Sequence, residues 1–138
     1  MRAVLLSFAL SSALVLAACG GITAPDLFIV HRSGSTPHAN LTLVVNEEGG
    51  VVCNGAKSKL KLGDSQIVKA RAIQEEIKEH ASKNLSLAAG PGSVLSYRLR
   101  DQDGTVSFAD DSRGQPKVLR ELALFVLQTA QQVCRLPE

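Results

Sequence analysis

The spacing of apolar residues changes along residues 26–138, and this change constrains the fold more than any other feature of the sequence. Residues 27–31 and 51–53 are short β-rich runs, and apolar residues alternate with their neighbours in residues 41–45. Residues 65–82 instead repeat their apolar side chains at helical spacing, at Ile67, Ala70, Ile73, Ile77 and Ala81. The first half of this region therefore predicts three strands followed by an amphipathic helix.

The second half predicts a β-hairpin and another helix. Apolar and polar residues alternate in residues 95–100 and again in 105–108. The intervening residues, 101–104, read Asp-Gln-Asp-Gly, which favours a hairpin turn; the alternative, a calcium-binding loop, lacks its later ligands. Pro116 suits the first turn of a helix, and a wide apolar face that includes Leu124 and Leu127 follows it. The predicted fold class is α+β: a small antiparallel sheet, in the order strands-helix-hairpin-helix, with two helices packed on one face.

Residues 1–18 have the pattern of an export signal. Arg2 precedes an apolar run that extends to Leu16 and is shorter than the roughly 20 residues that a membrane-spanning helix needs. The run closes with Leu16-Ala17-Ala18-Cys19, which resembles the lipobox of bacterial lipoproteins. In that family a peptidase cuts before the cysteine, whose thiol carries a diacylglycerol group. The alternative is an ordinary secretory signal with an incidental cysteine.

The lipobox resemblance implies a location and a domain division. Residues 1–18 are the expected signal peptide, 19–25 the lipidated Cys19 and a short tether, and 26–138 a single α+β domain. The chain also resembles uncharacterised lipoproteins of high-GC Gram-positive bacteria. We therefore expect an extracytoplasmic protein, held on the membrane at the cell surface or periplasmic side by the covalent diacylglycerol on Cys19, with no other cofactor.

The two remaining cysteines, Cys53 and Cys134, predict a disulfide, because an even pair in an oxidising compartment is usually bonded. Two free thiols are the alternative. The charge balance argues against nucleic-acid binding, since the chain after residue 18 carries 14 basic and 13 acidic side chains. The length suits one domain, which we expect to be a monomer.

No set of catalytic or metal-binding residues emerges from the sequence. Serines are present, but none lies in a nucleophile-elbow pattern. His31 and His38 flank one loop without an evident third metal ligand, and His80 falls on the polar side of the helix over 65–82. The adjacent Asp110 and Asp111 are expected simply to face water. We therefore expect neither a catalytic site nor a metal; an enzyme with an unrecognised site at His31 or His38 is the alternative.

Two exposed features are candidates for binding. The loop Ser33–Ala39 contains Gly34 and Pro37, and loops carried by a rigid sheet often bind partners. Its candidate residues are Ser33, Gly34, Ser35, Thr36, Pro37 and His38. Lys57, Lys59 and Lys61 form an alternating basic patch, which predicts either contact with anionic lipid or cell-wall polymer, or a strand edge guarded by lysines.

Several short motifs follow one another along residues 27–130. They are Ile29-Val30-His31-Arg32-Ser33-Gly34, Leu41-x-Leu43, Tyr97-Arg98-Leu99, Asp103-Gly104 and a Leu-rich helix after Pro116. In this order they resemble the emfourin family, small proteins that inhibit thermolysin-like metalloproteases. The chain departs from that family at Ser35, where a second glycine is usual, and in its cysteine pair and anchor. The leading expectation is a non-enzymatic domain that binds an envelope or secreted protein; an emfourin-like protease inhibitor is the alternative.

Overall fold

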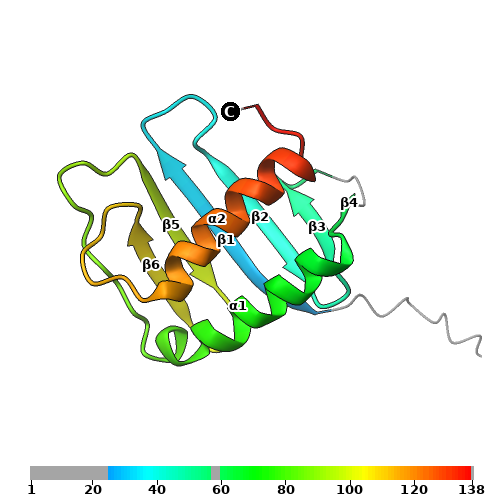
Figure 1. Ribbon diagram of the computed structural model, residues 1–138, viewed down its shortest axis with the longest axis horizontal. Helices are drawn as coiled ribbons and strands as arrows, with labels where there is room; N and C mark the ends of the chain where they lie inside the picture. Colours follow the sequence, from blue (N-terminus) through cyan, green and yellow to red (C-terminus); the bar gives the residue numbers. More distant parts are fainter. Residues whose placement is uncertain (1–24, 57–59, 138) are drawn as a thin grey trace, which may run out of the picture.

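The computed structural model of the protein describes residues 25–56 and 60–137. These residues form six strands and two helices, shown in chain order in Figure 1. The elements are β1 (Asp26–Gly34), β2 (Leu41–Asn46), β3 (Gly50–Cys53), β4 (Leu60–Lys61), α1 (Asp64–Ser82), β5 (Leu95–Arg100), β6 (Thr105–Ala109) and α2 (Lys117–Gln132). The predicted order of strands, helix, hairpin and helix is confirmed, and β4 is an additional strand too short to show a sequence pattern.

The strands form one antiparallel sheet in the order β4-β3-β2-β1-β5-β6. The central strand is β1, which pairs with β2 on one side and with β5 on the other. Val30 lies opposite Leu43 of β2 and opposite Leu99 of β5, and all three side chains are fully buried. Because directly paired residues point to the same face, they form one row of the hydrophobic core.

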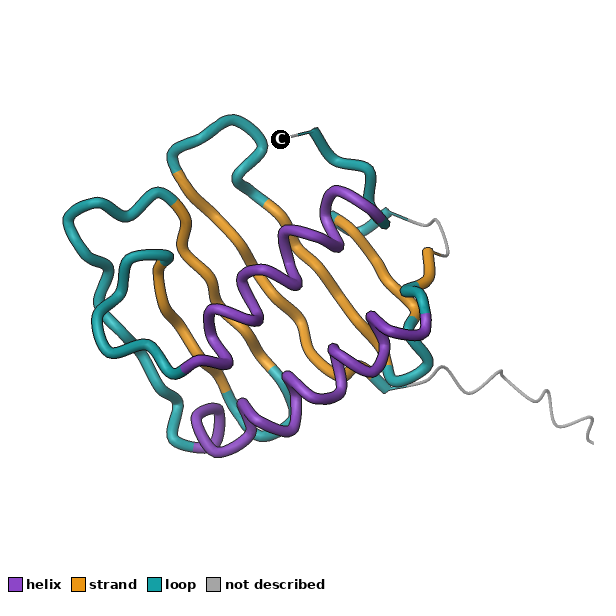
Figure 2. The backbone as a smooth tube through the Cα atoms, in the orientation of Figure 1, coloured by secondary structure: helices purple, strands orange, loops and turns teal. Residues whose placement is uncertain are grey.

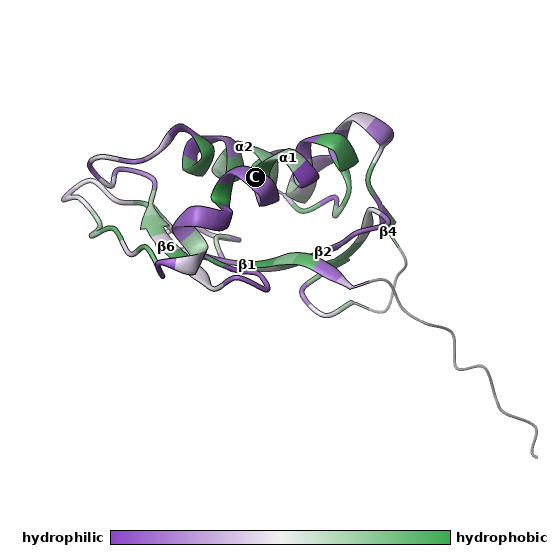
Figure 3. Ribbon diagram, turned by 90° about the horizontal axis from the view of Figure 1, so that it is seen from below, coloured by the Kyte–Doolittle hydropathy of each residue, from purple (hydrophilic) through white to green (hydrophobic). Residues whose placement is uncertain are grey.

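Both helices pack on the same face of the sheet, as Figures 1 and 3 show from two directions. The apolar stripe of α1 buries Ile73 and Ile77, and α2 buries Leu119, Leu122 and Val126. This arrangement confirms the predicted α+β class with two helices on one face. The opposite face of the sheet has no helix on it among the residues described.

Leu124 and Leu127 do not join the core, contrary to the wide apolar face expected of the second helix. Their side chains remain 52% and 42% exposed. At about 100° per residue, both point well away from Leu122 and Val126, which face the sheet. The buried stripe of α2 is therefore narrower than its composition suggested.

An ion pair joins the two helices, which run side by side in Figure 2. Lys69 of α1 contacts the carboxylate of Glu121 in α2, and Lys117 contacts the same carboxylate at 2.9 Å. The hydrogen bonds from Lys69 and Lys117 lower the pKa of Glu121 from its ordinary value of 4.5 to about 2. Glu121 is therefore charged throughout the neutral pH range.

The two edges of the sheet are protected differently. Residues 85–87 run beside β6, where the Leu87 amide donates to the Ser107 carbonyl and the Ser107 amide to the Leu85 carbonyl, each at 2.9 Å. At the other edge, β4 is two residues long and carries the exposed Lys61. A short edge strand with a lysine discourages pairing with another chain.

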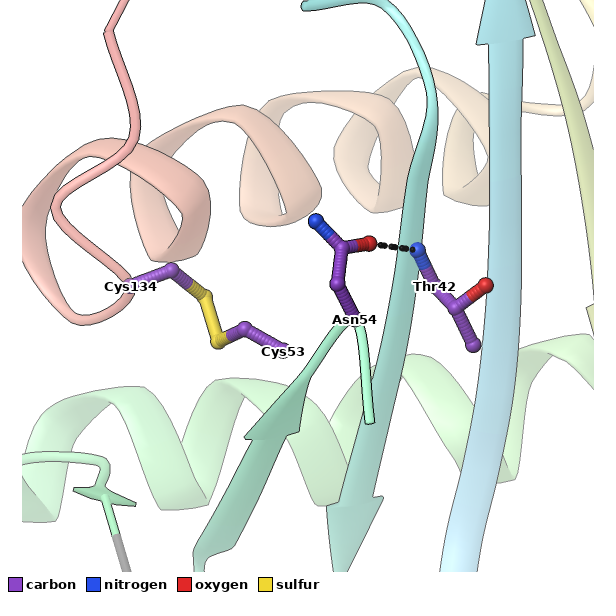
Figure 4. Close-up of a disulfide and its surroundings, with 4 residues drawn as sticks. All are labelled: Thr42, Cys53, Asn54 and Cys134. Atoms are coloured by element: carbon purple, nitrogen blue, oxygen red, sulfur yellow. Dashed lines mark hydrogen bonds between the residues drawn. A yellow bond between two sulfur atoms is a disulfide. The ribbon is translucent and has the colours of Figure 1, made fainter. Parts of the chain in front are cut away.

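A disulfide joins Cys53, at the end of β3, to Cys134, just beyond α2, with 6.0 Å between their Cα atoms (Figure 4). The predicted pairing is therefore present. Next to it, the Asn54 side-chain oxygen accepts a hydrogen bond from the Thr42 amide at 2.8 Å. The disulfide thus connects the end of the second helix to the sheet, across the two layers of the fold.

Candidate functional site

The predicted binding residues lie where β1 passes into the connection with β2. Ser33 and Gly34 are the last two residues of β1, and Ser35 to His38 form the connection, which extends beyond the strands in Figure 2. All six residues are exposed. We refer to residues 33–39 as the β1–β2 loop. Its exposure satisfies the first requirement for binding a partner.

The buried side chain of Arg32 binds the backbone of this loop. Only 8% of Arg32 is exposed, because β1 points it to the helix side of the sheet, two residues after Val30. Its Nε donates to the Ala39 carbonyl at 2.9 Å, and its Nη2 donates to the His38 carbonyl at 3.1 Å. Hydrogen bonds from a charged donor are stronger than those from neutral ones. Arg32 therefore fixes the far end of the loop to the strand at which the loop begins.

The backbone of the loop is tightly turned. His38 adopts a positive φ of 62°, which is uncommon for a residue with a side chain. The Ala39 amide donates to the Thr36 carbonyl at 3.2 Å, and the Ala39 side chain is buried. The bond from Arg32 to the His38 carbonyl stabilises the residue with this unusual conformation. The exposed side chains of Thr36, Pro37 and His38 are thus carried on an ordered backbone.

A neighbouring segment, residues 90–95, which leads from the connection after α1 into the first residue of β5, supports the other end of the loop. The Ser35 amide donates to the Val94 carbonyl at 3.2 Å. Gly34 packs so closely here that a Cβ on it would lie 2.3 Å from the same carbonyl oxygen. A glycine is therefore needed at position 34 for the two segments to approach each other.

Asp110 and Asp111 do not simply face water, as the sequence suggested, but hold residues 90–95 in place. The Asp111 carboxylate accepts hydrogen bonds from the amides of Gly90 and Gly92, both at 2.8 Å. Asp110 accepts hydrogen bonds from the amides of Val94 and Leu95, at 3.1 and 3.0 Å. The expectation missed these hydrogen bonds because the amides come from a segment 15 to 21 residues earlier in the chain.

A cleft of about 360 Å³ lies between the β1–β2 loop and the C-terminal half of α2. Thr36 and Pro37 form one wall, and Leu127 and Ala130 of α2 form the other. The partly exposed Leu127 therefore has a place in this cleft rather than in the core. An apolar side chain of a partner that contacts the loop could enter here.

Of the other candidates, His31 lies on the face of the sheet without helices, and its Nδ1 is 3.1 Å from the Thr42 hydroxyl. Residues 101–104 form the hairpin turn that was predicted: Asp101 Oδ1 accepts hydrogen bonds from the amides of Asp103 and Gly104. Within residues 25–56 and 60–137, no three His, Cys, Asp or Glu side chains gather in a way that could hold a metal ion.

Several predicted features lie outside the described residues. These are the signal peptide over 1–18, the lipid-carrying Cys19, and Lys57 and Lys59. Lys61, the third lysine of that patch, lies on the edge strand β4. Among the described residues, no helix combines the length and apolarity that crossing a bilayer requires.

Arg32 is the residue of the candidate site that sequence reasoning missed. The signal for it was present, since Phe28, Val30 and Arg32 share one face of an alternating strand. A charged residue at an inward position must find partners, and the carbonyls of a following turn are the nearest ones.

Comparisons of the chain with protein-family models, with characterised proteins and with solved structures gave no match.

Proposed function

We propose that this protein is a lipid-anchored, extracytoplasmic binding domain without catalytic activity, which uses the β1–β2 loop to hold another protein of the envelope or its surroundings. The observation that supports this most directly is that the loop is exposed and yet held at both ends, by Arg32 and by residues 90–95. An ordered loop loses little conformational entropy when a partner binds. The apolar cleft beside it would add a pocket for one partner side chain.

The position of the loop also supports this role. It lies at one end of β1, and Asp26, where the chain enters the sheet, lies at the other (Figure 1). Nine residues of strand span about 25–30 Å. A lipid on Cys19, seven residues before Asp26, would keep the Asp26 end within about 25 Å of the membrane. The loop at the opposite end of β1 would then remain accessible to a partner.

A narrower proposal is that the partner is a thermolysin-like metalloprotease, as the resemblance to emfourins implies. A loop that extends beyond the sheet and is already held in one conformation can enter a protease cleft with little change of shape. The cleft between Pro37 and Leu127 would receive a side chain from the rim of the protease. This proposal names the first partner to test.

The test is a titration of a chain of residues 20–138 against a thermolysin-like metalloprotease, with an unrelated serine protease as control. This chain contains the whole hydrophobic core and both bonded cysteines. We expect stoichiometric inhibition of the metalloprotease alone. Thr36→Asp should abolish it. Gln102→Asp, an equal change at an exposed residue of the hairpin turn at the opposite end of the sheet, should leave it intact.

A second experiment tests loop binding without assuming a protease. A photo-crosslinking residue is placed at Thr36 in the anchored protein, and for comparison at Gln102. A discrete adduct from position 36 alone would support the loop as the binding site. Adducts of equal yield from both positions, or none from position 36, would contradict it.

A further inference from the structure

The face of the sheet without helices carries a cluster of hydrogen-bond donors far in sequence from one another. By strand register, His31 of β1 lies opposite Arg98 of β5, and Arg98 lies opposite Ser107 of β6. Ser33 lies opposite Ser96 in the next row. Directly opposed residues have Cβ atoms about 5 Å apart, so these five side chains are neighbours on one surface. Figure 3 shows that both helices lie on the other side of the sheet.

These five residues line a depression of about 370 Å³, with Leu87 at its edge. All of its polar lining side chains are hydroxyls, an imidazole or a guanidinium. No carboxylate lines it among the residues that the structure describes. A surface without negative charge and with a cation at its centre favours an anionic ligand.

Four of the five donor side chains in this depression have no partner among the described residues. Within the described part of the chain, the Arg98 side chain forms no ion pair or hydrogen bond, and the hydroxyls of Ser33, Ser96 and Ser107 form none either. His31 uses one ring nitrogen toward Thr42, which leaves its Nε2 for a ligand. Unpaired arginines at exposed positions are common, but here the arginine is surrounded by four further polar groups on rigid strands.

We propose that this depression binds a phosphate group, either free or as part of a phospholipid headgroup. The planar guanidinium of Arg98 matches two oxygens of a phosphate, and the three hydroxyls and the His31 ring match the others. A carboxylate has only two oxygens and would leave some of these hydrogen-bond donors without an acceptor. This site lies on the face of the sheet without helices, and Ser33 is the one lining residue that it shares with the β1–β2 loop. Its recognition of phosphate does not depend on which partner that loop binds.

The test is an NMR titration of residues 20–138 with inorganic phosphate at pH 7 and constant ionic strength. Saturable shifts are expected for the amides around His31, Arg98 and Ser107. Arg98→Gln should weaken binding about ten-fold or more, because it removes the charged, two-oxygen contact. Arg100→Gln is the matched control: it removes the next cation on the same face of β5, which lies opposite Thr105 and outside the depression. It should weaken binding about three-fold at most, since salt screens its charge.

A second arm distinguishes the two sources of phosphate by flotation with phosphatidylglycerol vesicles. Saturable binding of inorganic phosphate would identify a free phosphate compound as the ligand. Binding to the vesicles alone, lost in Arg98→Gln and kept in Arg100→Gln, would identify a headgroup. Absence of binding to both probes, or equal loss in the two variants, would overturn the proposal.

Discussion

Breaking the Cys53–Cys134 disulfide should lower the free energy of unfolding by about 4–5 kcal/mol. The two cysteines are separated by 81 positions in the sequence. For a loop of that length, the chain-entropy model says that the bond lowers the conformational entropy of the unfolded chain by about 15 cal/mol/K. This corresponds to about 4.5 kcal/mol of stabilisation at 25 °C. Domains of this size are typically stable by about 5–15 kcal/mol, so the loss would remove about 30% or more of the total.

The measurement is urea unfolding of residues 20–138, followed by circular dichroism, in the oxidised and the reduced protein. Reduction keeps both side chains and removes only the bond. The double variant Cys53→Ala/Cys134→Ala should unfold like the reduced protein, apart from the small loss of the buried Cys53 side chain. The m-value, which is the slope of the unfolding free energy against urea concentration, should also increase when the bond is broken, since the unfolded chain then exposes more surface.

Two results would refute this reasoning. A difference below about 1 kcal/mol between the oxidised and reduced proteins would show that the bond does not restrain the unfolded chain as the entropy model assumes. Two reactive thiols in the unreduced, unfolded protein would show that the bond is not formed at all.

Three further predictions concern the anchor, the loop and the helix pair. Cys19→Ser should release the protein from membranes; a variant that still sediments with them would contradict the anchor. Gly34→Ala should destabilise the domain by about 1–3 kcal/mol in urea unfolding, because its Cβ meets the Val94 carbonyl oxygen at 2.3 Å. Gly92→Ala, where the nearest atom is 3.5 Å away, should change stability by about 0.5 kcal/mol at most, and equal effects would refute the packing argument. Glu121 has its pKa lowered in the folded state to about 2 from 4.5. Its contribution to stability is therefore present above pH 4.5 and is lost as the pH falls toward 2. In Glu121→Gln, the free energy of unfolding should therefore fall less between pH 4.5 and 2 than it does in the unchanged protein. An equal fall in both proteins would contradict the ion pair of Glu121 with Lys69 and Lys117.

Much of the fold was predictable because its signals are local. The alternation in β5 and β6 and the helical spacing in α1 each lie within one short segment, and the core uses the residues that these patterns marked. The strand β4 was not predictable, since two residues have no period. The exposure of Leu124 was not predicted either, although at about 100° per residue its side chain points away from Leu122 and Val126.

The candidate site was predicted only in part. The β1–β2 loop was identified by its glycine and proline, but the features that hold it were not. Arg32 binds the carbonyls of His38 and Ala39 because the chain folds back on the strand, which no local pattern encodes. Asp110 looked like a solvent-facing residue until the fold placed the amides of residues 94 and 95 beside it.

By itself, the sequence determined the order of the longer strands and the helices, the inward faces of α1, β5 and β6, and the availability of a cysteine pair. These depend on spacing along the chain and on the tendency of apolar side chains to leave water. Only the tertiary structure decided that β1 lies at the centre of the sheet and that His31, Arg98 and Ser107 share a surface. The physical reason is that strand pairing depends on contacts between segments that are distant in the sequence, which no local pattern encodes. In this sheet it brings together residues that are as many as 76 positions apart in the chain.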